Sequence, residues 1–285
     1  METFLQAIAA GVLIGGLYGL VSVGLSLIFG VLRIVNFAHG EFVMLGMYGA
    51  YVLQGALGLD PLVSLLILGP VFFVFGALVQ HLLVRRILAA PDLAQIFLTV
   101  GLSIVLANAA LLVFGADYRG VTTPYGDAFL SVGAIILPWT RIIAFAGAAI
   151  LAGLLTLFLS RTDLGRAMRA AAQDREVAML LGIDPDRVFL VAFGLGAALA
   201  AAAGVLLVTF YPVSPTAGTQ FGLIAFVVVI LGGLGSLGGA LAAGFVVGVV
   251  ESLGRFYLQA DWALILVFSM MLLVLNLRSG RLLVR

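Results

Sequence analysis

Long apolar stretches separated by short polar segments set the pattern of this chain. The stretches cover 4–32, 37–59, 62–84, 93–114, 133–159 and 188–211. A bilayer core of about 30 Å is crossed by a helix of roughly 20 apolar residues, so each stretch is long enough to span it. The pattern therefore predicts an all-α, polytopic transmembrane helix bundle that forms a single domain over 1–285.

The last apolar region, 221–277, is too long for one helix and must hold two or three. Glycines interrupt it at 232–239, so one tilted helix could cover 221–253, or two helices could meet at the glycines. We favour two helices, which gives about nine membrane passes, with eight as the alternative. A broken or re-entrant element at the glycines is a further option, because irregular backbone is tolerated in a membrane where it lines a cavity.

The arginines indicate orientation, because short cytoplasmic loops retain basic residues. With the N-terminus outside, the outer connections hold only Arg119 and Arg141. The inner connections and the C-terminal segment then hold Arg33, Arg85, Arg86, Arg161, Arg166, Arg169, Arg175, Arg187, Arg278, Arg281 and Arg285. We therefore expect a periplasmic N-terminus and a cytoplasmic C-terminus. Acidic Glu2 and the length of the first apolar stretch favour a retained membrane helix over a cleaved signal peptide.

Composition narrows the possible chemistry. The chain is 64% hydrophobic and 9% charged, with mean hydropathy +1.27, which is far more apolar than a soluble domain needs. Its 14 basic residues are all arginine, which excludes lysine chemistry such as a Schiff base. The absence of cysteine excludes thiolate and disulfide chemistry. A net charge of +1 on scattered arginines gives no clustered basic face for nucleic acid.

The longest polar segment, 160–187, lies on the predicted cytoplasmic side. A helix is expected over 164–181, with Asp163 as its N-cap and Gly182 ending it in the left-handed conformation. Pro185 then marks the return into the membrane. Charged and apolar residues alternate along this helix, so it is amphipathic and either lies on a surface or docks into a partner.

The sequence 233–238 matches the dinucleotide pattern G-x-G-x-x-G, but membrane-length apolar runs flank it instead of a strand and a helix of a βαβ unit. Close helix packing, or an unwound turn facing a cavity, is the better interpretation for Gly232, Gly233, Gly235 and Ser236. Packing is also the default for the glycines spaced four apart, which are Gly11/Gly15/Gly19, Gly235/Gly239 and Gly244/Gly248.

Polar residues Asn36, His39 and Glu41 follow the first apolar stretch. A metal pair or proton relay is conceivable, since intramembrane ionisable groups are functional candidates. Their place at the first inner turn, near the membrane interface, favours a structural role, with Asn36 as a helix N-cap and Glu41 in the first turn. His81, beside Arg85 at a predicted helix exit, is interpreted as interfacial.

Glu251 and Arg255 are spaced i,i+4 near the outer end of a predicted span and are expected to pair inside the bundle. A structural ion pair and a place on a transport route are equally open. Asn108 and Gln95 are weaker route candidates. No catalytic triad, carboxylate pair or metal cluster stands out in the sequence, so we expect a non-catalytic chain without cofactor or metal.

Two segments resemble the high-affinity branched-chain amino acid ABC transporter permease family. Residues 19–42 resemble its N-terminal signature, in the form of the smaller of its two membrane subunits. The second segment is 161–183, where Glu176-Val177-Ala178 and then Gly182 resemble the E-A-A-x-x-x-G loop through which import permeases engage their ATPases. Val177 stands where that loop has its first alanine, and no I-x-L-P follows. The glycine segment 232–239 also resembles the family.

The resemblance implies a permease subunit of an importer that moves branched-chain or other small amino acids across the bacterial inner membrane. It implies a homologous second permease, two ATPase subunits and a periplasmic substrate-binding protein as partners. It also implies that 161–187 is a cytoplasmic coupling loop. The candidate coupling residues are Gly165, Arg166, Arg169, Ala170, Asp174, Glu176, Ala178 and Gly182. Candidates for the translocation route or for packing are Asn36, His39, Glu41, Asn108, Gly232, Gly233, Gly235, Ser236, Glu251 and Arg255.

Two alternatives remain open from the sequence. The same machinery could carry urea, a short amide or another small polar solute. A stand-alone secondary transporter is the alternative from another class, with the intramembrane Glu251 and Arg255 as its support.

Overall fold

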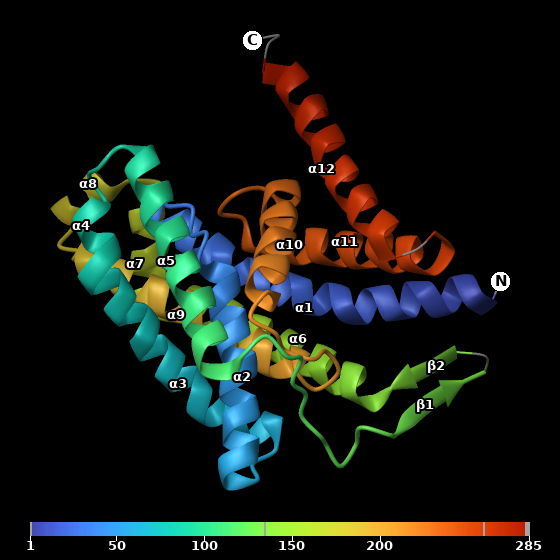
Figure 1. Cartoon of the computed structure of the whole chain (residues 1–285). Helices are drawn as coiled ribbons and strands as arrows, with labels where there is room; N and C mark the ends of the chain where they lie inside the picture. Colours follow the sequence, from blue (N-terminus) through green and yellow to red (C-terminus); the bar gives the residue numbers. More distant parts are fainter. Residues whose placement is uncertain (1, 134, 259, 283–285) are drawn as a thin grey trace.

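The computed structural model describes residues 2–133, 135–258 and 260–282, and leaves out the side chains of 260–261 and 278–282. Arg285 lies outside the described residues, as do the side chains of Arg278 and Arg281. The longer helices, shown in Figure 1, are α1 (Glu2–Leu32), α2 (His39–Leu57), α3 (Pro61–Val79), α5 (Asp92–Phe114), α6 (Trp139–Arg161), α9 (Pro185–Leu207), α10 (Ala217–Gly232), α11 (Leu237–Tyr257) and α12 (Ala260–Leu282).

Six shorter elements connect or extend these helices. They are the π-helical turn η1 (Gln80–Val84), α4 (Arg85–Ile87), the strands β1 (Phe129–Val132) and β2 (Ile135–Pro138), α7 (Asp163–Gln173) and α8 (Arg175–Leu180). Because η1 and α4 continue α3 without a break, 61–87 forms one long helical unit.

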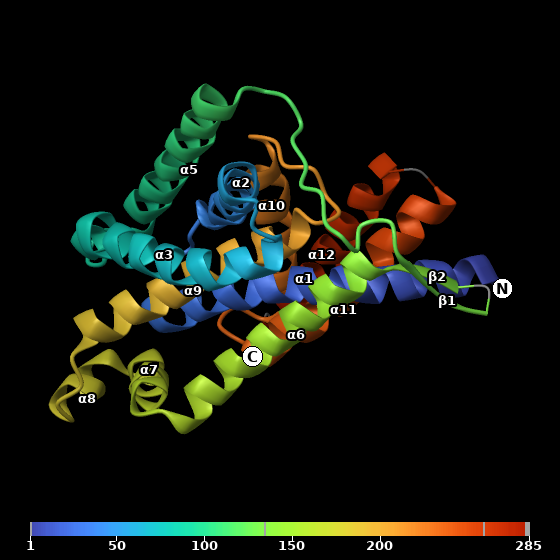
Figure 2. The ribbon, with the colours of Figure 1, turned by 90° about the horizontal axis from the view of Figure 1, so that it is seen from below.

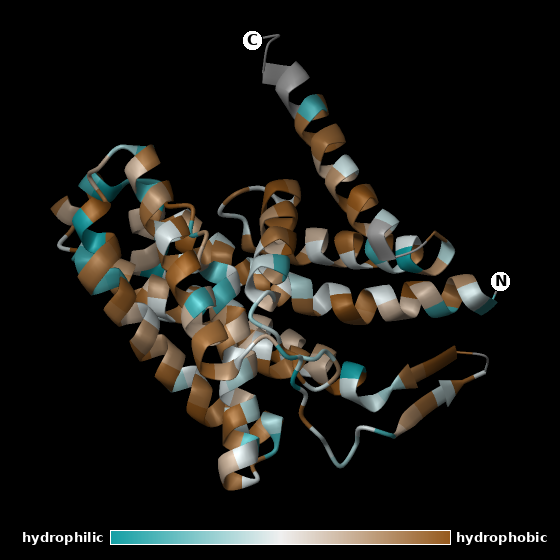
Figure 3. Ribbon diagram, in the orientation of Figure 1, coloured by the Kyte–Doolittle hydropathy of each residue, from teal (hydrophilic) through white to brown (hydrophobic). Residues whose placement is uncertain are grey.

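The chain is a polytopic helical bundle. By length and apolar composition, six helical units in the described part of the chain can cross a membrane: α1, α3 with its extension to Ile87, α5, α6, α9 and α11. The shorter α10 and the 262–277 part of α12 are also apolar. Figure 3 shows hydrophobic residues along these helices, while hydrophilic residues gather near α4 and α8.

The core is built on α1 and α9, which are the most deeply buried of the six long units. α1 packs against α11 and α9, and α9 packs against α2 and α3. Figure 2 shows the two ends of the bundle, with α7 and α8 at one end and the N-terminus and the β1–β2 hairpin at the other. Gln6 ties these last two together, because its side-chain amide donates to the Ile136 carbonyl at 2.7 Å and accepts from the Ile136 N–H at 2.8 Å.

Glycines let α1 and α11 meet backbone to backbone. A Cβ added at Gly15 would lie 2.8 Å from both the Gly244 carbonyl oxygen and the Phe245 Cα. A Cβ at Gly11 would lie 2.6 Å from the Val249 Cα. The prediction that the glycines spaced four apart serve packing is confirmed for this pair of helices, because only residues without side chains allow so close an approach.

The glycine segment separates two helices, as favoured from the sequence. α10 ends at Gly232, and α11 begins at Leu237 after a turn in which Gly233 and Gly235 have φ of 96° and 80°. Ser236 caps α11, because its hydroxyl accepts from the Gly239 N–H at 3.1 Å. The glycine pattern therefore marks a helix–helix junction and not a dinucleotide site.

The β1–β2 hairpin departs from the all-helical prediction. Phe129 pairs with Pro138 and Val132 with Ile135 in an antiparallel register. The stretch 133–159 was expected to be one span, but its helix begins only at Trp139. An apolar strand of four residues is not distinguishable from a helix by hydropathy alone, which is why the prediction was wrong here.

The loops at the hairpin end are joined by side-chain contacts. Arg119 donates to the Tyr51 hydroxyl at 2.9 Å, and its backbone pairs with Val213 at 2.9 and 2.7 Å. The Tyr125 hydroxyl donates to Asp60 Oδ1 at 3.2 Å. Burial and the neighbouring Asp60 carboxylate both raise the pKa of Tyr125, so its hydroxyl stays protonated and remains a donor.

Candidate functional site

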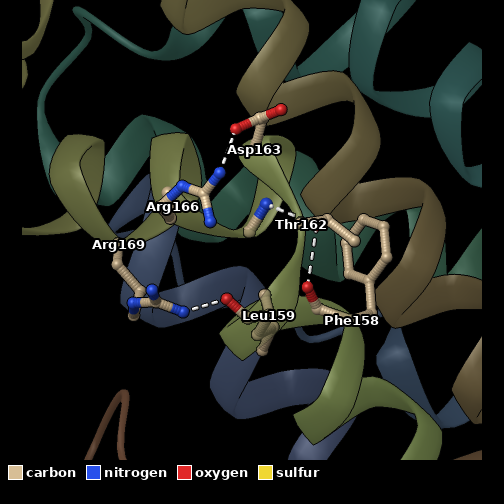
Figure 4. Close-up of polar contacts among 7 residues, drawn as sticks. Phe158, Leu159, Thr162, Asp163, Arg166 and Arg169 are labelled. Atoms are coloured by element: carbon tan, nitrogen blue, oxygen red, sulfur yellow. Dashed lines mark hydrogen bonds and ion pairs between the residues drawn. The ribbon is translucent and has the colours of Figure 1, made fainter.

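The connection between α6 and α7 is fixed by Thr162. Its hydroxyl donates to the Phe158 carbonyl at 2.7 Å and accepts from the Gly165 N–H at 3.0 Å (Figure 4). Thr162 is therefore the N-cap of α7, and the prediction that Asp163 has this role is wrong. Asp163 is the first helical residue and bonds the Arg166 guanidinium one turn later. A carboxylate is favourable there because the helix N-terminus carries partial positive charge.

The polar loop contains two helices instead of the single helix expected over 164–181. Asp174 is extended (φ −149°, ψ 114°), so it ends α7. Its Oδ1 then accepts from the N–H groups of Glu176 and Val177 at 2.9 and 3.1 Å, so the same side chain caps α8. An aspartate within an amphipathic run offers the backbone an alternative to the helical ladder, and this is the physical reason for the break.

Several of the predicted coupling residues make contacts inside the protein that hold the loop in place. Gly165 and Ala178 are buried, and a Cβ at Gly165 would lie 2.5 Å from the Leu159 Cα. Arg169 donates to the Leu159 carbonyl (Figure 4). The contacts of Gly165 and Arg169 with Leu159 attach α7 to the end of α6.

The remaining predicted residues lie nearer the surface. Arg166 and Glu176 are exposed, and Ala170 is half-buried. Gly182 has φ 81°, and the N–H of the following Ile183 donates to the Ala178 carbonyl at 3.1 Å. The left-handed role predicted for Gly182 at the end of the loop helices is confirmed.

The outer surface of α8 exposes apolar residues that the sequence analysis did not single out as site residues. Leu180 is 87% exposed and Leu181 74%, and Val177 and Met179 are exposed beside them. We call these four residues the α8 patch. It lies at the most hydrophilic end of the bundle, the same end as α4 (Figures 1 and 3). The spacing could have indicated it, because Val177, Leu180 and Leu181 lie three and four residues apart on one helical face.

The polar residues at the start of α2 lie deep in the bundle. Arg33 ends α1 with φ 57°, and the chain then turns back, so that Asn36 and His39 are fully buried. The His39 Nε2–H donates at 2.9 Å to the carbonyl of Val21, which lies well inside α1. These residues are more deeply buried in the bundle than the sequence indicated for a turn near the membrane interface. Hydropathy does not reveal that an extended segment runs back into the interior.

Asn36 does not cap α2. Its side-chain oxygen accepts from the Ala38 N–H at 3.1 Å, and Ala38 is the N-cap residue, with no side-chain capping bond. Glu41 does lie in the first helical turn, as expected. Within the described residues, Asn36 Nδ2, His39 Nδ1 and Glu41 Oε2 are buried without a hydrogen-bond partner.

Ser103 from α5 joins Glu41, and the sequence analysis missed it. The Ser103 hydroxyl donates to Glu41 Oε1 at 3.0 Å. One turn earlier, the Thr99 hydroxyl donates to the Val35 carbonyl at 3.2 Å, so α5 also contacts the connection between α1 and α2 through a polar side chain. Gln95, Thr99 and Ser103 lie four residues apart, and this polar stripe in an apolar helix was the available signal.

Glu251 and Arg255 form the predicted ion pair. Glu251 Oε1 accepts from Arg255 Nε and Nη2 at 2.9 and 2.6 Å. The Glu251 side chain is 3% exposed and that of Arg255 is 45% exposed, so the pair is half open. Tyr18 and Arg141, which the sequence analysis did not select, line the same pocket of about 120 Å³.

The other candidates for the translocation route lie apart from the Glu41–Ser103 and Glu251–Arg255 pairs. Asn108 lies on the exposed side of α5, where its amide donates to the Ile104 carbonyl at 2.8 Å. Gly235 packs against Gly30 of α1, and the Ser236 carbonyl accepts from the Ser26 hydroxyl at 3.4 Å. The glycine turn therefore contacts the end of α1. His81 is exposed.

The sequence matches a known family of membrane proteins. Residues 7–275 match the family model described as the permease component of the branched-chain amino acid transport system. The chain belongs to this permease family. It is 33% identical to the high-affinity branched-chain amino acid transport system permease protein BraD of Pseudomonas aeruginosa over 288 residues, which cover 96% of this chain and 94% of BraD.

The chain is also similar to other permeases of branched-chain amino acid transport systems over most of its length. The chain is 34% identical to the permease protein LivH of Escherichia coli over 95% of its own length and 92% of LivH. It is also 29% identical to the permease protein LivM of Salmonella typhimurium, over 94% of this chain and 68% of LivM. No solved structure matches the chain.

Proposed function

We propose that this chain is a non-catalytic permease subunit of an ATP-driven importer that carries branched-chain amino acids across the bacterial inner membrane. The observation that carries the proposal is the match to branched-chain amino acid permeases over 7–275, nearly the whole membrane region. The helical bundle supplies a route across the membrane, and its few charged residues suit passage of a zwitterion with an apolar side chain.

The proposed complex contains a second permease, two ATPase subunits and a periplasmic binding protein. Similarity to both LivH and LivM, two differently named permeases, supports pairing with a homologous second subunit. ATP hydrolysis belongs to separate subunits in this proposal, because the sequence offers no lysine-containing phosphate loop.

Nine passes, with the N-terminus outside and the C-terminus inside, are the proposed topology. The nine longer helices allow it, although among the described residues only six of them are both long enough and apolar enough to cross a membrane. The other three are α2, α10 and α12. The arginine-rich α4 and the 161–187 loop lie at the same end of the bundle (Figure 1), where Arg85 pairs with Asp186, and this supports a cytoplasmic assignment for that end.

The α8 patch and the surface of α7 form the proposed coupling element, which docks into a groove of the ATPase. Exposed leucines on a charged loop favour a protein partner over water, since burying them on docking is stabilising. ATP-driven closure then moves the loop as a rigid lever and switches the helices between outward-open and inward-open arrangements. Gly165 and Arg169 attach the lever to α6.

Uptake into liposomes tests the proposal. The complete complex, supplied with binding protein and internal ATP, is expected to accumulate labelled leucine. Omitting the ATPase subunits is expected to abolish uptake. Gradient-driven leucine flux without those subunits would instead establish the secondary transporter. Accumulation of urea or a short amide, with no leucine uptake, would assign a different solute to the same machinery.

A further inference from the structure

Glu41 is a carboxyl group at mid-depth in the bundle without a basic partner. It is 1% exposed. Its partner Ser103 is the middle residue of α5, which places both groups about halfway across that membrane-length helix. Among the described side chains, the ion pairs of arginine involve Asp163, Asp184, Asp186 and Glu251, and none involves Glu41.

Only one of the two Glu41 oxygens is engaged by the protein. Oε1 accepts from Ser103, whereas Oε2 has no hydrogen-bond partner within the described residues. Oε2 lies against Gly218 at the start of α10, where any side chain would collide with it. The close approach continues at Gly40, where a Cβ would lie 2.6 Å from the Gly222 Cα. Small residues therefore bring two helix starts together around one carboxyl oxygen.

The starts of α2 and α10 both favour a charged carboxylate. The N-cap residues Ala38 and Thr216 make no side-chain capping bond, so the positive ends of both helix dipoles are uncompensated by a cap. Helices that begin near the middle of a membrane are a feature of substrate sites in transporters, because their free N–H groups can bind charged ligands there.

A pocket of about 170 Å³ opens beside Glu41, between α2, α5 and α10. Its other polar groups are Ser103 and Thr219, and its walls are apolar. Phe37 and Phe226 stack with ring centroids 4.8 Å apart and form one wall. The site thus combines an anionic point with an apolar lining, which is complementary to an ammonium group attached to an apolar side chain.

Resting on the proposed function, we infer that Glu41 binds the ammonium group of the amino acid during its passage. The Glu41 carboxylate and the Ser103 hydroxyl hold the ammonium, the first-turn N–H groups of α10 lie beside the substrate carboxylate, and Phe37 and Phe226 contact the side chain. A single carboxylate with one free oxygen binds weakly enough to release its ligand, which conduction requires.

Glu41→Gln tests the inference in the complete complex in liposomes with binding protein and ATP. The substitution keeps the shape of the side chain but removes its charge. Leucine uptake is expected to fall by about 10- to 100-fold, the range for losing a hydrogen bond to a charged group. Binding-protein-stimulated ATP hydrolysis is expected to remain within about twofold of wild type, because that readout reports the coupling loop and not the route.

Equal loss of uptake and hydrolysis would assign Glu41 a structural role and overturn the inference, as would unchanged uptake. If Glu41→Gln prevents assembly of the complex, Ser103→Ala tests the same inference, because it leaves the Glu41 carboxylate in place. It is expected to lower uptake by about threefold to tenfold, as for one lost hydrogen bond, with hydrolysis unchanged. Equal uptake by Ser103→Ala and wild type would then reject the site.

Thr99→Val is the matched control, since Thr99 lies one turn away on the same helix and bonds only backbone carbonyls. Its uptake is expected to equal that of wild type, and a loss matching that of Ser103→Ala would count against a specific site. A wild-type complex that takes up no branched-chain amino acid would refute the proposed function and the site with it. A functional wild type with a fully active Glu41→Gln variant would refute the site alone.

Discussion

Two buried glutamates occupy this bundle in different ways. An uncompensated charge at mid-bilayer costs roughly 2.5–3.5 kcal/mol, so each carboxyl group needs a reason to be there. Glu251 has a two-bond contact with Arg255, one helical turn away on α11. Glu41 has one serine and no cation among the described side chains. Glu251 therefore has its counter-charge within the chain, whereas Glu41 has none among the described side chains.

Arg255→Leu is expected to destabilise the protein by about 2 kcal/mol, because it leaves the Glu251 carboxylate buried without its partner. Adding Glu251→Gln is expected to recover most of that loss, since the amide buries no charge. Chemical denaturation in detergent micelles measures both variants. If the double variant is as unstable as the single one, the pair contributes through packing and not through charge.

At the scale of elements, the contact between α1 and α11 leaves no room for a side chain at its glycines. Gly15→Ala is expected to destabilise the bundle by about 1–3 kcal/mol, because the added methyl group meets backbone and neither helix has a side chain that can move aside. Gly153→Ala on α6 is the matched control, since a Cβ there meets nothing within 4 Å. Thermal unfolding followed by size-exclusion chromatography distinguishes them, and equal melting temperatures would contradict close packing at Gly15.

The α8 patch gives a second prediction for an element. Leu180→Ser with Leu181→Ser is expected to leave the bundle folded, because both side chains are exposed. Binding-protein-stimulated ATP turnover is expected to fall by about tenfold or more, as when central apolar contacts of an interface are removed. Gln173→Ala, an exposed polar residue of the same loop, is the control. Normal turnover in the leucine variant would reject the patch as the contact with the ATPase.

At the scale of the whole molecule, the proposed orientation places the β1–β2 hairpin outside and the 161–187 loop inside. The chain has no cysteine, so a single introduced cysteine is the one residue that a maleimide can label, and its labelling shows on which side of the membrane it lies. A membrane-impermeant maleimide added to intact cells with a permeable outer membrane is expected to label Ser131→Cys at once. Gln173→Cys is expected to react only after the inner membrane is opened. The reverse pattern would invert the topology and remove the coupling role of α8.

Hydropathy and glycine spacing were sufficient to predict most of the bundle. Most of the long helices, the junction at Gly232 and the packing role of the spaced glycines follow from which residues can lie in lipid and which allow close approach. Which two helices the glycines bring together does not follow from the sequence. These are properties of single segments, which a sequence records directly.

The depth of Glu41 and its contact with Ser103 could not be predicted in the same way. They depend on the chain turning back after Arg33, a tertiary feature that local patterns do not encode. The break at Asp174 was missed because an aspartate in an amphipathic run fits a surface helix equally well. The exposure of the α8 patch depends on which face of α8 packs against α7 and α9, and this is determined only by the folded contacts.

The glycine contact of α1 with α11 also restricts how this protein can change over evolution. In most cores a larger side chain can be accommodated when a facing one becomes smaller. Gly15 and Gly244 already have no side chain, so neither can shrink to compensate for growth of the other. A selection for second-site suppressors of a bulky residue at one position should therefore find none at the other, and the two positions are free to vary only if the helices move apart.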